Sequence, residues 1–416
     1  MPFASWSMPA LSAESSGPMA TSPSDRSVDP IDGGFGIYVH WPFCVSKCPY
    51  CDFNSHVRES IDQEGWRRAL VRDLEHALDS ITVSTDQKLT SVFFGGGTPS
   101  LMEPDLVAGV LGALKDRSLL GDDTEVTLEA NPSSADAERF EGYSESGVNR
   151  LSVGVQALDD GALRFLGRRH DVTEALGAVE TAREVFDRVS FDLIYARQGQ
   201  TPTAWREELK RVLALEPTHV SLYQLTIERG TRFHEAHARG DLVLPDEDDS
   251  AEMYEDTVSQ CGEVGLQAYE VSNFAFPGEE CRHNLIYWRS GDWLGVGPGA
   301  HGRMGMGENR VALRQWRSPE KWRDAVEDSG SGLEAVEALN ESDRAAEALM
   351  MGMRLTEGVS AKRFERIVGT SLWDGINSDR LDELVAGGFL ERTTKGIRAT
   401  ARGRNVLNTL VTELLI

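Results

Sequence analysis

Three cysteines stand close together in the segment Cys44-Val-Ser-Lys-Cys48-Pro-Tyr-Cys51, with the spacing C-x3-C-x2-C. Thiolates are soft ligands that suit iron–sulfur clusters and zinc. A structural zinc site needs a fourth ligand and usually pairs two C-x2-C clips; here only His40 or His56 could complete the set. Three thiolates on a cluster of four irons would leave one iron open, and an open iron can chelate the amino and carboxylate groups of a methionine moiety.

Further residues of ligand-binding type follow downstream. Gly95-Gly96-Gly97-Thr98-Pro99 offers glycines, which let backbone groups approach a ligand closely. Glu129 offers a carboxylate for hydroxyl or ammonium donors, and the guanidinium of Arg168 matches the geometry of a carboxylate. Gln156 and Asp192 add two polar side chains. A strand-to-helix turn and solvated loop residues are the plainer interpretations, but three consecutive glycines exceed what a turn needs.

Alternating strands and helices must position these residues. Short runs rich in Val, Ile, Leu, Tyr and Phe predict strands at 36–41, 90–95, 125–130, 150–156, 189–195 and 219–226. Helices are expected between them, at 60–80, 103–116, 134–146, 159–167, 172–186 and 202–214. Asp105, Ser134 and Thr203 stand near three helix starts, as capping residues would. Six βα units favour an α/β fold, a parallel sheet closed into a partial (β/α)6 barrel.

The candidate ligand-binding residues share one edge of this expected sheet. Cys44, Gly96, Glu129, Gln156 and Thr226 fall at or just beyond the carboxyl ends of the strands, whereas Asp192 falls earlier in its strand. In α/β barrels the carboxyl ends of the strands form the face where chemistry happens.

The chain divides into four expected segments. Residues 1–34 are rich in Ser, Pro and Ala and predict a flexible tail. Residues 35–300 are expected to form the barrel and its C-terminal extension. Residues 301–339 are expected to connect the barrel to a small, mainly helical domain at 340–416. Within them, 291–307 are glycine-rich and are expected to be loop-like. The last segment has a winged-helix layout, with helices at 361–368, 377–387 and 400–414 and a hairpin before the last helix.

Composition excludes several classes of protein. The 416 residues carry a net charge of −25, which repels phosphate backbones and argues against a nucleic-acid partner despite the winged-helix layout. Five cysteines, three of them clustered, do not resemble a disulfide framework and favour a cytoplasmic metal site. No apolar run reaches the length of a membrane span, and no secretory signal is evident.

The segment HWPFCVSKCPYCDFNS carries a resemblance. It is similar to the radical-SAM superfamily, over about residues 35–300, and within it to the group of oxygen-independent coproporphyrinogen III oxidase. The resemblance implies a [4Fe–4S] cluster on Cys44, Cys48 and Cys51. It also implies S-adenosylmethionine (SAM) as a cofactor, cleaved to a 5′-deoxyadenosyl radical. The SAM contacts that it implies are Tyr38, Tyr50, Gly96, Gly97, Thr98, Glu129, Gln156, Arg168, Asp192 and Thr226, with Arg169 as an alternative register for Arg168.

Two features separate an oxidase from a heme chaperone of the HemW type. Phe53 stands where the oxidase pattern has a fourth cysteine, which makes coproporphyrinogen decarboxylation the alternative. His283-Asn-Leu-Ile-Tyr287-Trp288 resembles the HNxxYW motif of the heme chaperones. A neutral imidazole ligates heme iron and aromatic rings pack on a porphyrin, although a lone histidine is more often structural. The resemblance thus implies heme as cargo on His283. It leaves open the roles of Cys281 and His301.

The same resemblance implies the partners. They are heme and acceptor hemoproteins, some of them associated with a membrane, so the chain is expected in the cytoplasm with peripheral membrane contact. A homodimer is a further possibility that the sequence leaves open.

Overall fold

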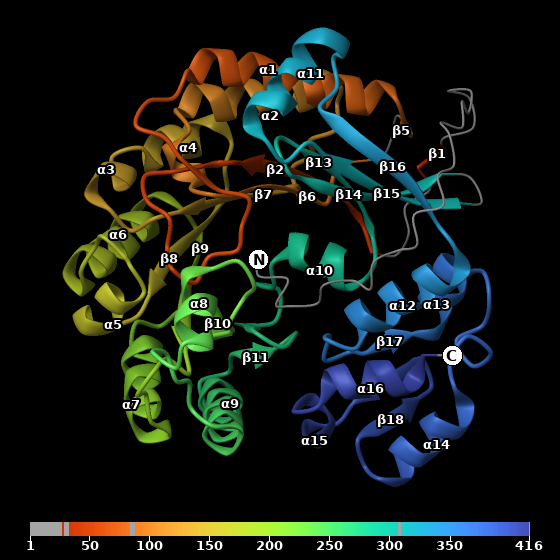
Figure 1. Ribbon diagram of the computed structural model, residues 1–416. Coiled ribbons are helices and arrows are strands. Elements are labelled where there is room, and N and C mark those ends of the chain that lie inside the picture. The colour runs from red at the N-terminus through yellow and green to blue at the C-terminus, as the bar shows by residue number, and fades with distance from the viewer. Residues whose placement is uncertain (1–26, 29–32, 84–87, 307–308, 416) are drawn as a thin grey trace.

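One long curved sheet organises the molecule (Figure 1). The computed structural model describes residues 27–28, 33–83, 88–306 and 309–415. Six parallel strands form neighbouring pairs in chain order and confirm the expected barrel strands. They are β2 (Phe35–Trp41), β6 (Ser91–Gly96), β7 (Glu125–Ala130), β8 (Arg150–Gln156), β9 (Arg188–Tyr195) and β10 (His219–Gln224).

Helices cover the outer, convex face of this sheet (Figure 1). They are α1 (Gln63–Asp79), α2 (Pro104–Asp116), α3 (Ser134–Ala137), α4 (Phe140–Ser146), α5 (Asp160–Phe165), α6 (Val172–Val185), α7 (Pro202–Leu213) and α9 (Glu247–Glu263). The short helix α8 (Arg232–Ala238) instead lies against the cysteine segment, where the Phe233 amide donates to the Pro49 carbonyl at 2.9 Å. The helix expected over 134–146 is therefore two helices. No helix within the described ranges combines the length and the apolar character needed to cross a bilayer.

The helix caps differ from the expected ones. Thr201, not Thr203, caps α7 by accepting a hydrogen bond from the Ala204 amide at 3.2 Å. Glu103 is the N-cap of α2 and makes no side-chain capping bond, so Asp105 lies inside the helix. Proline explains the shift. Its fixed φ suits the first position of a helix, so α2 begins at Pro104 and α7 at Pro202, and the N-cap is the residue directly before each proline.

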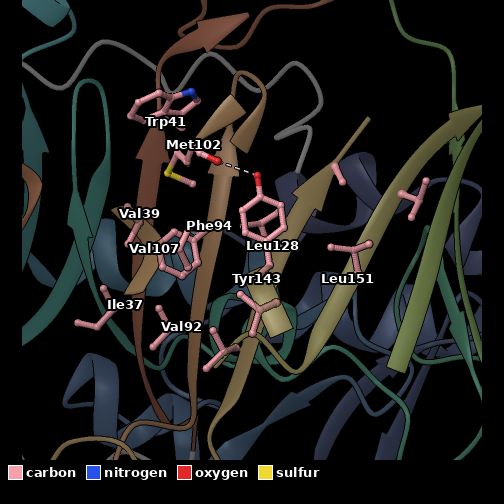
Figure 2. Packing of buried hydrophobic residues seen from close by; sticks show 14 of the residues in the cluster. Ile37, Val39, Trp41, Val92, Phe94, Met102, Val107, Leu128, Tyr143 and Leu151 are labelled. Atoms are coloured by element: carbon pink, nitrogen blue, oxygen red, sulfur yellow. Dashed lines mark hydrogen bonds between the residues drawn. The ribbon is translucent and has the colours of Figure 1, made fainter. Parts of the chain in front are cut away.

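Strand alternation gives the sheet two different faces. Ile37, Val39, Val92, Phe94 and Leu128 point outward and are buried under the helices (Figure 2). The hydroxyl of Tyr143 from α4 donates to the Met102 carbonyl at 2.7 Å inside this core (Figure 2). The residues between them, such as Tyr38, Thr127 and Glu129, point to the barrel interior, because successive side chains of a strand alternate faces. The interior face therefore presents polar side chains that a ligand could contact.

Strands after the barrel extend the same sheet. β13 (Asp292–Val296) pairs in parallel with β2, and β14 (His301–Met306), β15 (Asn309–Gln315) and β16 (Leu333–Leu339) follow in antiparallel order, with α11 (Pro319–Ser329) between the last two. At the other edge, β12 (Asn273–Ala275) pairs antiparallel with β10, and β11 (Gln267–Ala268) pairs antiparallel with β12. The prediction that 291–307 is loop-like was wrong. Glycine is required in these strands by close packing, since a Cβ on Gly295 would lie 2.3 Å from the His301 carbonyl oxygen.

The C-terminal part has a core of its own. It comprises α12 (Glu341–Gly352), α13 (Ala361–Val368), α14 (Ser378–Ala386), α15 (Ala401–Arg404), α16 (Leu407–Leu414) and a three-stranded sheet of β17 (Val359–Ser360), β18 (Leu390–Thr393) and β19 (Gly396–Ala399). A break at 405–406 divides the helix expected at 400–414. Ion pairs Arg303–Glu347 at 2.8 Å and Arg289–Glu357 at 2.7 Å join this part to the barrel.

Most of the expected tail 1–34 lies outside the described residues. Within it the structure describes residues 33–34, which lead into β2, and β1 (Ser27–Val28), which pairs in parallel with β5 (Thr82–Val83).

Candidate functional site

The three clustered cysteines lie on one loop at the carboxyl end of β2. The loop leaves the short strand β3 (Phe43–Cys44) and returns at β4 (His56–Val57), and these two strands pair in parallel at its base. Cys44, Cys48 and Cys51 all line a cavity of about 610 Å³ at the mouth of the barrel. The structure thus brings the three thiols to one side of one cavity.

The surroundings of the cysteines bear on the kind of metal group that they could hold. Among the described residues, no three His, Cys, Asp or Glu side chains are arranged to hold a single metal ion. Nε2 of His40, a possible fourth zinc ligand, is instead 2.9 Å from the Asn54 carbonyl oxygen. Burial raises the pKa of Cys44, and raises that of Cys51 to about 11. Thiolates here need cationic compensation, which a cluster of irons supplies.

The glycine segment forms the second wall of the cavity. Gly96 ends β6 with φ +115°, and its amide donates to Oε2 of Glu129 at 3.3 Å. A Cβ on Gly96 would lie 2.8 Å from the Trp41 carbonyl oxygen, and one on Gly97 would lie 2.7 Å from that of Phe43. The glycines are therefore needed for packing under the cysteine loop, besides the ligand approach that the sequence suggested. Thr98 donates its hydroxyl to Sγ of Cys44 at 3.4 Å.

Arg168 links the cysteine loop to the barrel. Its Nη1 donates to Sγ of Cys48 at 3.6 Å, and its Nη2 donates to Oδ1 of Asn131 at 2.6 Å and to the Gly154 carbonyl at 3.2 Å. Arg169 is exposed on the cavity rim. Asn131 was not among the predicted site residues, and it also donates to Oγ1 of Thr98 at 3.4 Å. Its position two residues after Glu129, just past the end of β7, was the available signal.

The remaining expected SAM contacts complete the wall. Glu129, Gln156, Asp192, Thr226 and Tyr50 all line the cavity. Gln156 ends β8 with φ +69°, a backbone conformation that non-glycine residues seldom adopt. Burial is the main cause that raises the pKa of Glu129 and of Asp192, and the proximity of the two carboxylates adds to it for Glu129. Both carboxyl groups therefore gain stability from a cationic ligand.

Tyr38 and His283 lie apart from this cavity, deeper in the barrel. The rings of Tyr38 and His283 stack with a centroid distance of 6.1 Å, and Phe93 lies 5.1 Å from His283. His283 is completely buried in α10 (Arg282–Trp288), a helix inside the curve of the sheet (Figure 1). Its Nδ1 is 2.7 Å from Oγ of Ser91, and its Nε2 is 2.8 Å from the Tyr287 hydroxyl. Both ring nitrogens are thus engaged, and heme ligation by His283 stays a prediction.

The two residues whose roles the sequence left open have structural positions. Cys281 is buried at the start of α10, where burial raises its pKa to about 12, and its Sγ is 3.6 Å from Oε1 of Glu125. His301 is exposed at the start of β14, and its carbonyl accepts from Nε1 of Trp293 at 3.0 Å.

Comparisons with known proteins agree with this architecture. The profile of the Radical SAM superfamily matches residues 38–212, and that of the HemN C-terminal domain matches residues 339–406. "Heme chaperone HemW" from Escherichia coli is 35% identical over 378 residues, which cover 90% of this chain and 96% of the relative. The mouse protein "Radical S-adenosyl methionine domain-containing protein 1, mitochondrial" is 40% identical over 386 residues, covering 91% and 87%.

The chain belongs to the HemW family of the radical-SAM superfamily. Among solved structures, coproporphyrinogen III oxidase (HemN) from Escherichia coli superposes with a TM-score of 0.75 at 22% identity, covering 91% of this chain and 89% of that one. This likeness establishes the fold. Membership of the superfamily implies SAM and a [4Fe–4S] cluster as the cofactors of the HemW-type barrel.

Proposed function

We propose that this chain is a heme chaperone, which binds heme and delivers it to acceptor hemoproteins. The observation that carries the proposal is the match to proteins named heme chaperone along nine-tenths of the chain, 90% for the Escherichia coli relative. Phe53 supports it, because a phenyl ring lines the cavity where the oxidase pattern has a fourth cysteine. The proposal places the protein in the cytoplasm, with acceptors that include membrane-associated hemoproteins and with a homodimer as one form.

The cavity residues divide the cofactor binding between them. We assign the cluster to Cys44, Cys48 and Cys51, which share one loop and one cavity wall. When bound and reduced, a [4Fe–4S] cluster supplies one electron for cleavage of SAM to methionine and a 5′-deoxyadenosyl radical.

SAM would lie between the cysteine loop and the strand ends. Gly96, Gly97, Thr98, Gln156, Arg168 and Thr226 all line the cavity that would receive it. The carboxylates of Glu129 and Asp192 suit its ammonium and hydroxyl groups. Tyr50, half-buried on the cavity wall, would shield the site from water, whereas Tyr38 would act indirectly, through its hydroxyl 3.2 Å from Nδ1 of His40.

His283 is the proposed heme ligand. Burial lowers its pKa to about 3, so the imidazole is neutral at pH 7 and keeps a lone pair for iron. Ligation through Nε2 would exchange the 2.8 Å hydrogen bond with Tyr287 for an iron bond, and because His283 is completely buried it would also require α10 to move. Tyr287 and Trp288 on the same helix would then offer aromatic faces to the porphyrin.

Heme titration of anaerobically reconstituted protein, followed by the absorbance spectrum, tests this proposal. We expect saturable binding that is at least tenfold weaker in His283→Ala, since the axial bond is lost. His219→Ala is the matched control, because His219 is also a buried barrel histidine, 2.9 Å from the hydroxyl of Tyr269.

Either of two results would contradict it. Absence of saturable heme binding would refute the chaperone, and turnover of coproporphyrinogen III would then establish the oxidase. If His283→Ala and His219→Ala weakened heme binding equally, the loss would reflect damage to the fold, and the axial ligand would have to be another residue.

A further inference from the structure

The glycine-rich turn between β13 and β14 lies against the cysteine loop. Gly297 and Gly299 have φ values of +97° and +80°. A Cβ on Gly297 would lie 2.4 Å from the carbonyl oxygen of His40, and one on Gly299 would lie 2.4 Å from Nδ2 of Asn54. Both contacts are with residues that flank the cysteines, so the sequence Gly-Pro-Gly at 297–299 is shaped to receive this loop.

Asn54 joins the two segments through every donor of its side chain. Its Nδ2 donates to the Pro298 carbonyl at 2.9 Å and to the Arg317 carbonyl at 2.9 Å. An amide nitrogen has two hydrogens, and both are used. The two acceptors belong to different segments, one before β14 and one after β15, so one side chain ties the loop to two parts of the extended sheet.

The backbone of Asn54 is fixed from the other side. Burial lowers the pKa of His40 to about 4, so its ring is neutral at pH 7 and carries one N–H. The Asn54 carbonyl oxygen, 2.9 Å from Nε2, can only accept, which places that hydrogen on Nε2. Nδ1 then accepts from the Tyr38 hydroxyl at 3.2 Å. Asn54 is therefore hydrogen-bonded both to His40 on the barrel strand β2 and to the turn 297–299.

We propose that Asn54 is a positioning residue that clamps the cysteine loop onto the turn 297–299 and thereby holds the three thiols in place for a cluster. Outer groups that orient metal ligands commonly change metal affinity by about 10- to 100-fold when they are replaced. The clamp lies three residues beyond Cys51 and contacts no ligand itself. The inference depends on the proposed cluster site and is independent of heme.

Two variants disrupt the contact between Asn54 and the turn 297–299, one by changing Asn54 and the other by changing the turn. Asn54→Asp keeps the shape of the side chain but replaces both N–H donors by an acceptor that faces two carbonyls. Gly299→Ala leaves Asn54 intact and places a methyl group against its amide. Gly278→Ala is the matched control, because Gly278 also has a positive φ, +94°, but nothing within 4 Å of the added Cβ.

The measurement is the rate at which reconstituted full-length protein loses its cluster to an iron chelator, followed by absorbance at constant pH. Iron content and the EPR spectrum of the reduced cluster are recorded beside it, with thermal unfolding of the cluster-free chains. We expect loss to be about 10- to 100-fold faster in Asn54→Asp and Gly299→Ala than in wild type, with the cluster-free chains still folded and unfolding no earlier than Gly278→Ala, which carries the same positive-φ strain. Gly278→Ala should lose its cluster at the wild-type rate.

Wild-type rates in both clamp variants would overturn the proposal. So would an equal drop in the stability of the cluster-free chains, or their failure to fold, because the contacts would then serve the fold rather than the cluster. A wild-type chain that takes up no cluster would refute the cluster site and this inference together. A failed heme titration with normal cluster uptake would refute the chaperone alone.

Discussion

Two adjacent arginines show how position decides the role of a residue type. Arg168 reaches Cys48, Asn131 and Gly154 with the two ends of its guanidinium, whereas Arg169 is exposed on the cavity rim. A planar fork can contact several acceptors at fixed angles, which a lysine ammonium cannot reproduce. The register that the sequence left open is therefore settled in favour of Arg168 for contact with the cysteine loop.

Replacing Arg168 by Lys should weaken SAM binding. We expect a loss of roughly tenfold, which corresponds to one charge-assisted hydrogen bond of about 1.5 kcal/mol. Equilibrium dialysis of reconstituted protein against labelled SAM measures it, and Arg169→Lys is the control at the same kind of residue. A wild-type affinity in Arg168→Lys, or an equal loss in both variants, would contradict the assignment.

Site residues could be predicted where a local sequence pattern indicated their role. The cysteine spacing and the polar residues at strand ends were enough to place Cys44, Glu129 and Gln156 around one cavity. The bonding of His283 was beyond the sequence, because its partner Ser91 is 192 positions away and belongs to another strand. Nothing local distinguishes a buried, doubly bonded histidine from an exposed one.

At the scale of elements, the start of α10 depends on a carboxylate from the barrel. The N-cap residue, Cys281, makes no side-chain capping bond. Instead, Oε1 of Glu125 on β7 accepts from the Arg282 amide at 2.8 Å and from the His283 amide at 3.4 Å. Its Oε2 accepts from Arg188 at 2.7 Å. A side chain 157 positions away thus replaces a local cap and holds the helix that carries His283.

Glu125→Gln should destabilise the fold strongly. The change leaves buried Arg150 without its anionic partner, and removal of one member of a buried pair costs about 3 kcal/mol or more. Urea unfolding measures the change, and Glu320→Gln is the control, since the exposed pair of Glu320 with Arg58 is worth about 1 kcal/mol or less. Similar losses in the two variants would show that the carboxylate of Glu125 is not special.

Elements were predictable where side chains alternate or repeat, and not where glycine replaces side chains. The strands at 125–130 and 150–156 match β7 and β8 to the residue. β13 and β14 were missed because Gly295 and Gly302 lie where backbones approach too closely for a Cβ, so the usual β-branched pattern is absent. β13 pairs with β2, and β14 pairs with β13 and β15, so their positions depend on strands that the local sequence pattern does not contain.

At the scale of the whole molecule, one buried carboxyl group gathers three distant segments. Asp73 on α1 is 1% exposed, and its oxygens accept from the Gly332 amide at 2.8 Å and the Gly297 amide at 3.4 Å. These amides precede β16 and follow β13, so α1 is tied to both ends of the sheet extension. No periodicity in the sequence could have predicted this contact, because it joins residues 224 and 259 positions apart.

Asp73 should make the stability of the protein depend on pH near neutrality. Burial raises its pKa from 3.8 to about 7, although the bonds from Gly332 and Gly297 oppose the shift. The folded chain therefore binds a proton that the unfolded chain releases between these values. The stabilising contribution is complete below about pH 4 and is lost as the pH rises to about 7, with a limit of about 4 kcal/mol.

Asp73→Asn tests this argument, because an amide cannot ionise and still offers an acceptor to one of the two glycines. Urea unfolding at pH 5 and pH 8 should show a smaller fall in the free energy of unfolding for the variant than for wild type. Exposed Asp105 supplies the control, and Asp105→Asn should keep the wild-type pH dependence. Equal slopes in all three proteins would mean that Asp73 is ionised in the folded state. In that case the Asp73 carboxylate would be charged where it joins α1 to the sheet extension, and the hydrogen bonds from Gly332, Gly297 and Gln315 would be enough to stabilise its charge.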